Sequence, residues 1–406
     1  MVETIGETSD AYFRSLIRRD GPPRHITFKD LKLHWPRLAE CGFGAAMLVL
    51  ILDKVVTGID YLRQNNEYSA LDYFRKNIGV WEELTFPSLT NLGSNNLRIM
   101  RCAYAKLNIY PGDAFLERSE RQATLKMSEF SAKSLRHTLC ADATLGVIPG
   151  REYLQACEEH INEIRTGNPE NGFRPRDRVD ILWAAAIFAA IGQETFSEEL
   201  IQRLYGSVIE LPDIPDMHKT KILTAGRFFN LPAPAFAWPA TDQKPSSLRD
   251  GLGGALQAIG AKLCQPKHLS GTDISIDLCL QPNETTRHEV LIETGGVSHF
   301  VYRDGKILGL DGKTLFMTAL MCGDHPEHAF VWVSNFTYGA LKSPPEAAET
   351  QFQDFLSVLD NLPPGPYYAF PGEDWKVNIS RLDINLTGTK PRQNNVSKPP
   401  GLDLAG

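Results

Sequence analysis

Residues 107–116 have the sequence LNIYPGDAFL, and residues 145–154 have the sequence LGVIPGREYL. The Pro-Gly pair and the aromatic-Leu pair after it fall in register at an offset of 38 residues. Upstream, residues 101–105 (RCAYA) align with residues 139–143 (LCADA) at the same offset. A Gly/Pro break between two apolar stretches predicts two helices joined by a turn. A period near 38 is typical of helical-hairpin arrays.

Looser copies follow the first two. Residues 181–196 contain a third copy, with the sequence ILWAAAIF at its start, and residues 222–232 contain a degenerate fourth. From residue 26 to residue 231 the apolar residues recur at steps of three and four, which is the period of an amphipathic helix. A single hairpin cannot bury its apolar face, so neighbouring hairpins must stack. The sequence therefore predicts a helical-hairpin repeat array over 26–231, preceded by a flexible leader over 1–25.

The pattern changes at Pro232. Several prolines followed by an apolar pattern predict a linker and one helix over 232–264. Strict alternation over 274–280 predicts a β-strand, and short apolar runs and helical patterns follow it. We therefore expect a small α/β domain over 265–375. The Gly, Thr, Lys, Pro, Asn and Ser residues that follow predict a mostly disordered tail over 376–406.

Composition excludes several classes of protein. The chain has 406 residues, of which 42% are hydrophobic and 22% charged, as in ordinary globular proteins. No apolar run reaches the ~18 residues that span a bilayer, so no membrane partner is expected. The first 25 residues resemble neither a secretory signal nor a transit peptide. The seven cysteines form no C-x-x-C pair, which excludes a zinc knuckle and predicts buried thiols in the cytoplasm or the reducing interior of an organelle.

The net charge of −7 does not suggest a nucleic-acid binder, but the charge is unevenly distributed. Residues 98–136 carry eight basic and four acidic side chains, whereas residues 151–200 carry five basic and ten acidic ones. A polyanion needs a local basic stripe and no more. The candidates for RNA binding in the basic stretch are Arg98, Arg101, Lys106, Lys126, Lys133 and Arg136. The same charges also fit an ordinary solvated helix face, and the acidic stretch favours a protein partner.

Two motifs resemble known families. The 38-residue hairpin with a Leu-Trp-Ala-x-Ala core at residues 182–186 resembles octotricopeptide repeats. Residues 292–300 (IETGGVSHF), followed by residues 310–314 (LDGKT), resemble the RAP domain, whose pattern is roughly I-E-x-D-G-P-S-H-F and then G-x-T-x-x-K in a helix. The two modules commonly occur together in proteins that bind organellar or microbial RNA and control its processing, stability or translation. FAST-kinase-like proteins share this layout, and the resemblance covers about residues 95–345.

The resemblance to the RAP domain also implies a fold similar to that of PD-(D/E)xK nucleases, whose carboxylates hold a divalent metal. Here Gly295 stands at the family's Asp position and Met317 at its helix Lys position, whereas Glu293 is retained. A lone carboxylate binds hydrated Mg²⁺ poorly. We therefore expect no catalytic residue, no metal and no cofactor. If the protein is a nuclease, the reaction would depend on Glu293, His299 and Lys313.

Ser298, His299 and Lys313 are further candidates for RNA contact. Neighbours in a strand point to opposite faces, so a nucleophilic Ser–His pair is not expected. A structural role for His299, bonded to the loop before Asp311, is the alternative. The two histidines of residues 325–328 (HPEH) lack a further zinc ligand at a suitable spacing and predict a surface loop.

The sequence thus predicts an α-helical repeat solenoid followed by a small α/β domain that resembles the RAP fold. We expect an RNA-binding protein in post-transcriptional control, with the repeats as the binding surface and the RAP-like domain as an accessory contact. The RNA is expected to be single-stranded. A protein-binding scaffold that uses the concave face of the repeats is one alternative. A divergent metal-dependent RNA endonuclease is the other.

Overall fold

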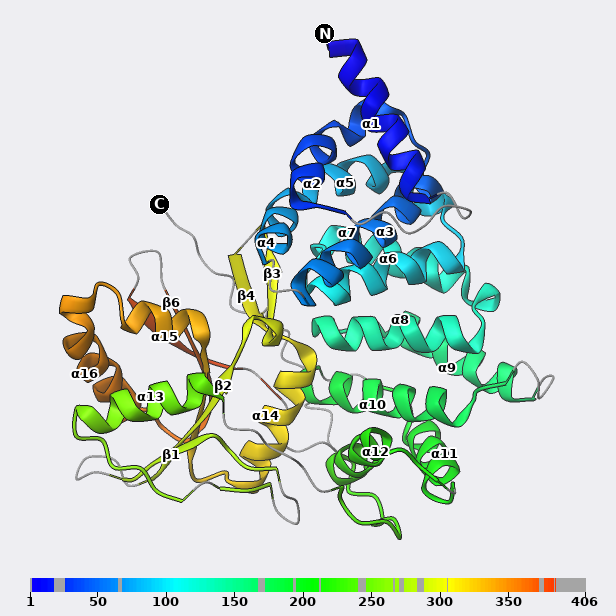
Figure 1. Ribbon diagram of the computed structural model, residues 1–406. Coiled ribbons are helices and arrows are strands. Elements are labelled where there is room, and N and C mark those ends of the chain that lie inside the picture. Colours follow the sequence, from blue (N-terminus) through cyan, green and yellow to red (C-terminus); the bar gives the residue numbers. More distant parts are fainter. Residues whose placement is uncertain are drawn as a thin grey trace. The chain divides into compact units, whose positions relative to one another are not determined.

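The protein, a computed structural model, contains 16 α-helices and two β-sheets among its described residues (Figure 1). These residues are 2–17, 26–64, 68–166, 172–192, 195–211, 213–239, 246–265, 267–269, 274–282, 288–304, 306–371, 376–382 and 384. They form two compact units. Unit 1 comprises Met1–Ala185, Glu194–Val208 and Phe300–Asp311, and unit 2 comprises Ala186–Gln193, Ile209–His299 and Gly312–Gly406. The described residues are therefore mostly helical, with a small mixed sheet toward the C-terminal end.

The helices of unit 1 pack in two layers. In one layer α6 (Ser94–Leu107) contacts both α3 (Ala45–Gln64) and α8 (Ala132–Leu145). In the other, α7 (Asp113–Leu125) contacts α9 (Arg151–Thr166). Large side chains such as Trp81 are fully buried in this unit. The remaining helical elements are α1 (Val2–Ile17), α2 (Phe28–His34), η1 (Trp35–Cys41), α4 (Tyr68–Asn77), α5 (Gly79–Thr85), η2 (Phe86–Asn91), η3 (Met127–Glu129), α10 (Pro175–Ile191), of which residues up to Ala185 belong to unit 1, and α11 (Glu198–Ile209).

Helix α1 occupies most of the segment that was expected to be a flexible leader. Its side chains Phe13 and Leu16 are buried. The ring of Tyr12 stacks on His34 of α2 at 4.1 Å between centroids. The prediction is therefore wrong for residues 2–17, because pairs of apolar residues four positions apart give this segment a buried side. Residues 18–25 lie outside the described residues.

The breaks in the two clearest sequence copies have the same geometry. Asn108 caps the C-terminal end of α6 and Gly146 that of α8, and both residues adopt the left-handed conformation, with φ of 52° and 66°. In both copies the next amide donates to the carbonyl five residues back, at 3.0 Å. A left-handed residue after the last turn ends a helix and redirects the chain. The 38-residue offset in the sequence thus corresponds to two equivalent turns in space.

A hairpin from the second half of the chain belongs to unit 1. Strand β3 (Phe300–Arg303) pairs antiparallel with β4 (Lys306–Leu310). The Tyr302 amide donates to the Asn108 carbonyl, and the Tyr302 carbonyl accepts from the Tyr110 amide, both at 2.8 Å. The guanidinium of Arg75 lies over the Tyr302 ring, 3.6 Å from its centroid. The α/β domain expected over 265–375 is therefore interrupted, because residues 300–311 complete the helical unit.

Unit 2 is built around a five-stranded mixed sheet. The strand order is β1 (Leu278–Leu280), β2 (Val290–Gly295), β5 (Ala329–Ser334), β6 (Gly365–Pro371) and β7 (Val377–Arg381). The three central strands are parallel, and the two edge strands are antiparallel to their neighbours. Strand β7 shows that the disordered tail expected over 376–406 is wrong for residues 377–381. Residues 383 and 385–406 lie outside the described residues.

Helices cover both faces of this sheet (Figure 1). Alternate strand residues such as Ile292 and Val331 pack against α13 (Ser247–Ala258), α15 (Asn335–Leu341) and α16 (Ala348–Leu359), which follows the short helix η6 (Pro345–Ala347). On the other face Trp332 of β5 donates to the hydroxyl of Thr318 in α14 (Gly312–Asp324) at 2.6 Å. Glu293 and Gly295 point to the α14 face, because side chains alternate along a strand.

The boundary between the units differs from the expected boundary at residue 231. Helix α12 (Asp216–Phe228), expected to belong to the helical array, is part of unit 2. Its Phe228 ring contacts Phe316 of α14 at 5.2 Å, and Arg227 forms an ion pair with Asp324. The helix expected within 232–264 is α13. Residues 240–245 of the expected linker lie outside the described residues.

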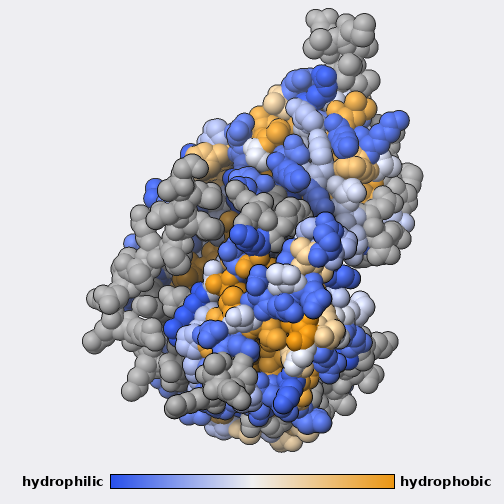
Figure 2. Space-filling view, turned by 90° about the vertical axis from the view of Figure 1, so that its left-hand side faces the viewer, coloured by the Kyte–Doolittle hydropathy of each residue, from blue (hydrophilic) through white to orange (hydrophobic). Residues whose placement is uncertain are grey.

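Figure 2 shows the face of the molecule that lies on the left of Figure 1. In its lower half, hydrophobic residues gather between hydrophilic ones. Exposed apolar side chains of unit 2 include Phe336 of α15 and Val358 of α16, which are 39% and 47% exposed. This face is therefore mixed in character. Across the described part of the chain, no helix combines the length and the apolar character needed to cross a membrane.

Candidate functional sites

Arg101 and Arg136 are buried in ion pairs. They are 3% and 5% exposed. Arg101 Nη1 donates to Asp142 Oδ2 at 2.6 Å, and Arg136 pairs with Asp180 at 2.7 Å and with Asp177 at 3.0 Å. Burial disfavours the charge of Arg101, but the neighbouring Asp142 more than offsets this, so the pKa of Arg101 is raised. The prediction that these two arginines bind RNA is wrong, because both guanidinium groups are committed to buried carboxylates.

Helices α6, α8 and α10 are joined by contacts in which one partner of each pair recurs at the sequence offset. Cys102 Sγ donates to the His137 carbonyl and Cys140 Sγ donates to the Asp180 carbonyl, both at 3.7 Å. The two cysteines are 38 residues apart, as are Asp142 and Asp180, the partners of the buried arginines. Helices α6, α8 and α10 are thus joined by the same kinds of bond. Their outward side chains therefore lie on a common face.

Cationic side chains gather on this face around His137 of α8. Burial, Arg136, Arg98 and Lys133 together lower the pKa of His137 to about 4. Arg98 is half-buried near the start of α6, and Lys133 is exposed near the start of α8. Arg176, whose side chain is 64% exposed, adds a charge near the start of α10, where it lies 3.8 Å from Asp180.

Lys106 extends this face along α6. Arg98, Cys102 and Lys106 follow one another at four-residue steps, so they lie along one side of the helix. We call Arg98, Lys106, Lys133 and Arg176 the basic face. Lys126, another predicted RNA ligand, instead pairs with Glu129 at 2.7 Å after the end of α7.

Glu293, expected to be a lone carboxylate, has a carboxylate partner. Asp277 precedes β1, and its amide donates to Glu293 Oε2 at 3.2 Å. Asp277 Oδ2 accepts from the amide and the hydroxyl of Thr294, at 2.9 and 2.5 Å. Antiparallel pairing of β1 with β2 places the two acidic residues side by side. Burial, and to a lesser extent Asp277, raise the pKa of Glu293 to about 8, so the uncharged acid predominates at neutral pH.

Ser298 and His299 lie in a short 3-10 helix, η5 (Val297–His299), between β2 and β3. Ser298 is exposed. His299 Nδ1 lies 3.0 Å from the hydroxyl of Thr314 in α14, and its ring lies 5.5 Å from that of Trp332. A Cβ at Gly295 would come within 3.1 Å of both rings, so a larger residue there would have to displace a ring by a few tenths of an ångström. His299 thus packs at the end of the sheet, with Thr314 as its partner.

Lys313 is exposed at the second position of α14. Glu293, in contrast, is partly buried and paired with Asp277. A nuclease reaction was expected to depend on Glu293, His299 and Lys313. The carboxylate beside Glu293 belongs to Asp277, which was not among these three residues.

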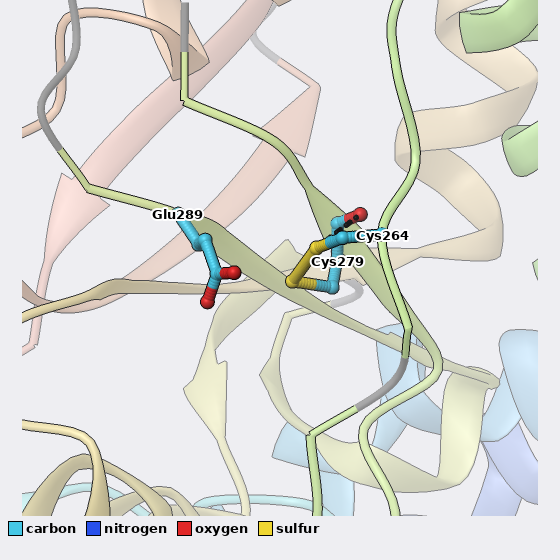
Figure 3. A group of neighbouring side chains, drawn as sticks. All are labelled: Cys264, Cys279 and Glu289. Carbon is cyan, nitrogen blue, oxygen red and sulfur yellow. Dashed lines mark hydrogen bonds between the residues drawn. A yellow bond between two sulfur atoms is a disulfide. The ribbon is translucent and has the colours of Figure 1, made fainter.

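Two of the seven cysteines form a disulfide, so the expectation of unpaired thiols is wrong for them. Cys264 and Cys279 are joined with their Cα atoms 5.3 Å apart. Figure 3 shows the carboxylate of Glu289 beside the two sulfur atoms. One ligand atom from each of the three residues lies within 4.8 Å of the others. Next to them, His328 Nε2 is 3.2 Å from Glu289, and His328 forms a second group with His325 and Glu327.

Asp277 and Arg176 were absent from the sequence-based candidates, as was the group of Cys264, Cys279 and Glu289, which we call the sulfur cluster. A carboxylate in the middle of the alternating stretch 274–280, followed by Glu293 in the next strand, was a usable signal for the pair, because adjacent antiparallel strands bring such residues together. The sulfur cluster had no usable spacing signal, since its cysteines are 15 residues apart and meet through strand pairing.

No protein-family model matches the chain, and a search of curated proteins finds no significantly similar sequence.

Proposed function

We propose that the protein binds single-stranded RNA through the basic face of α6, α8 and α10 and acts in post-transcriptional control. The observation that carries this proposal is the cluster of Arg98, Lys133 and Arg176 near the starts of α6, α8 and α10. Phosphate groups supply most of the affinity in non-specific RNA binding, and adjacent cations follow a phosphate backbone.

The motif resemblances support the same function. The equivalent turns after α6 and α8, and the two cysteine donors 38 residues apart that each bond to the following helix of their layer, are consistent with an octotricopeptide-like repeat solenoid. We propose that unit 2 is a RAP-like domain, in which exposed Ser298 and Lys313 provide accessory RNA contacts. The buried arginines strengthen the proposal in one respect. They fix the helices in register, so the exposed cations are presented by a rigid surface.

The double variant Arg98→Glu/Lys133→Glu is expected to bind a labelled single-stranded RNA at least roughly tenfold more weakly than the wild type at moderate salt. If the wild type neutralises three phosphates, its affinity falls roughly 20-fold between about 50 and 200 mM salt, and the variant has a shallower dependence. Fluorescence anisotropy over a salt series measures both effects.

The control is Arg121→Glu/Arg151→Glu, which makes the same charge change at exposed positions of the other helix layer, on α7 and α9. Equal losses in both variants would mean that net charge alone sets the affinity, and RNA binding insensitive to salt would contradict the proposal. Binding of a protein from an extract, unaffected by ribonuclease and lost in Arg98→Glu/Lys133→Glu, would favour the scaffold alternative.

A divalent-cation-dependent RNA endonuclease is the second candidate, and the Asp277–Glu293 pair favours it. Two carboxylates fit the oxygen ligands that Mg²⁺ takes in proteins, so Asp277 and Glu293 are the residues that would hold such an ion. The ion would polarise a phosphate oxygen. Met317, which stands at the family's helix Lys position, supplies no ammonium group, and this weakens the case for hydrolysis.

The nuclease hypothesis predicts Mg²⁺-dependent cleavage of the labelled RNA that is lost in Asp277→Asn and in Glu293→Ala. Gel electrophoresis of the products tests it. Cleavage that persists in Glu293→Ala would show that a different site, or a contaminating nuclease, is responsible.

A further inference from the structure

The sulfur cluster of unit 2 is assembled by strand pairing. The Cys264 amide donates to the Cys279 carbonyl at 2.8 Å, which sets the two cysteines beside each other. Cys279 of β1 pairs with Leu291 of β2, and Glu289 lies two residues before Leu291. Because side chains two residues apart share a face of a strand, Glu289 lies on the same side of the sheet as Cys279. The three ligand atoms within 4.8 Å therefore follow from the register of the sheet.

These donors suit a thiophilic divalent ion. Zinc takes Cys sulfur at about 2.3 Å and carboxylate oxygen at about 2.0–2.2 Å, and a site with three protein ligands leaves its fourth position open. Cys279 is 1% exposed, and Cys264 and Glu289 are partly buried, so the site is shielded from solvent without being closed. Small movements of the side chains bring three atoms that already lie within 4.8 Å of one another to such distances from one ion.

The side chains around the cluster compensate the charge that a bound zinc ion and its ligands would carry. Two thiolates and one carboxylate around Zn²⁺ leave a net charge of −1. The ammonium group of Lys267 lies 2.9 Å from Glu289 and offsets that charge. His328 Nε2, 3.2 Å from the same carboxylate, orients it. Partners of this kind in the second coordination sphere hold a ligand in place and tune the affinity for the metal.

We propose that Cys264, Cys279 and Glu289 form a redox-controlled zinc site. The site cannot bind zinc while the two cysteines form a disulfide, and it binds zinc once they are reduced. In the reduction a small-molecule dithiol breaks the disulfide. The dithiol loses two electrons and two protons and becomes a cyclic disulfide, and the protein gains two thiols. Zn²⁺ then displaces both thiol protons and binds the two thiolates and the Glu289 carboxylate. The oxidised chain lacks both thiolates and binds no zinc at this site.

The test uses the full chain in two states. One sample is reduced with dithiothreitol and the other is kept oxidised, each is freed of excess reagent without air, and zinc is added and measured by elemental analysis after desalting. We expect one zinc per reduced chain and none at this site in the oxidised chain. Cobalt(II) added to the reduced chain is expected to give a thiolate-to-metal charge-transfer band, which reports sulfur ligands directly.

Variants assign the ligands. Cys279→Ser is expected to abolish the cobalt charge-transfer band of the two-sulfur site, and Glu289→Gln to weaken zinc binding about tenfold or more, whereas Lys267→Met is expected to weaken it about tenfold through the carboxylate. Cys102→Ser is the matched control, since Cys102 is also a partly buried thiol but lies in unit 1. It is expected to leave the zinc content unchanged.

The neighbouring group His325, Glu327 and His328 offers a rival site. Zinc binding that is lost in His325→Ala but retained in Cys279→Ser would overturn the proposal, as would equal zinc content in the oxidised and reduced chains. If Cys279→Ser fails to fold, alkylation of the reduced wild type replaces it. Zinc is then expected to protect Cys264 from iodoacetamide while Cys102 still reacts, and equal labelling of both would contradict the site.

Discussion

Asp142→Ala is expected to lower the free energy of unfolding of unit 1 by about 3–5 kcal/mol. Asp142 and Arg101 have side chains 1% and 3% exposed, and they lie 2.6 Å apart. Removing the carboxylate leaves a guanidinium buried without a counter-charge, and Arg101 keeps one further side-chain hydrogen bond, to Ser119 at 3.0 Å. Urea denaturation followed by circular dichroism measures the loss.

Two further variants show whether burial causes the effect. Glu199→Ala breaks an ion pair with Arg203 whose carboxylate is 87% exposed, and it is expected to cost less than about 1 kcal/mol. Replacing both buried partners, as in Arg101→Leu/Asp142→Leu, is expected to recover much of the stability lost in Asp142→Ala, because no charge remains buried. If Asp142→Ala costs no more than Glu199→Ala, the pair does not join α6 to α8 as described.

Glu293→Gln is expected to stabilise the protein at alkaline pH and to have little effect at acid pH. The pKa of Glu293 is raised from 4.5 to about 8 in the folded chain, mainly by burial and then by Asp277. A carboxyl group whose pKa is raised by folding destabilises the folded chain when it ionises. The free energy of unfolding is therefore undiminished below the pKa of the unfolded chain and declines as the pH rises from about 4.5 through 8. With allowance for its partial exposure, the loss amounts to about 3 kcal/mol by alkaline pH. Glutamine keeps the shape of the side chain and cannot ionise.

Thermal unfolding of the wild type and Glu293→Gln between about pH 5 and pH 9 measures this effect. The two melting curves should coincide at the acid end and separate as Glu293 ionises. Glu349→Gln, a change at an exposed carboxyl of α16, is the control and should follow the wild type. A constant difference between wild type and Glu293→Gln at every pH would mean that Glu293 is already ionised at the acid end.

The helical part of the fold was predictable because its signal is local. The Pro-Gly breaks and the apolar steps of three and four act over short stretches of sequence, and the turns after α6 and α8 occur where the pattern places them. Helix α1 was missed because Gly21 and two prolines suggested a loose segment, although Phe13 and Leu16 have helical spacing with their apolar neighbours. The hairpin β3–β4 could not be assigned to unit 1, because its bonds to Asn108 and Tyr110 link residues almost two hundred positions apart.

The candidate sites were harder to predict because their contacts also join residues that are far apart in the sequence. Arg101 and Arg98 are three residues apart in a basic stretch, and the sequence gives no sign that one is buried against Asp142 while the other stays near solvent. A count of charged residues gives the net charge of a stretch, but it does not show which side of the helix carries each charge. Asp277 was overlooked because the family pattern directed attention to position 295, where the rings of His299 and Trp332 pack closely against glycine.

The place of the hairpin β3–β4 in unit 1 has a consequence for how the protein is made. A ribosome synthesises the helical segments up to Val208 well before Tyr302 appears. At roughly 5–20 residues per second, the intervening stretch takes about 5–20 s to translate. Throughout that interval the carbonyl of Asn108 and the amide of Tyr110 lack their eventual partner. The helical unit is therefore completed late in translation, and a nascent chain that stalls before residue 300 would be left with an open edge that chaperones or proteases can recognise.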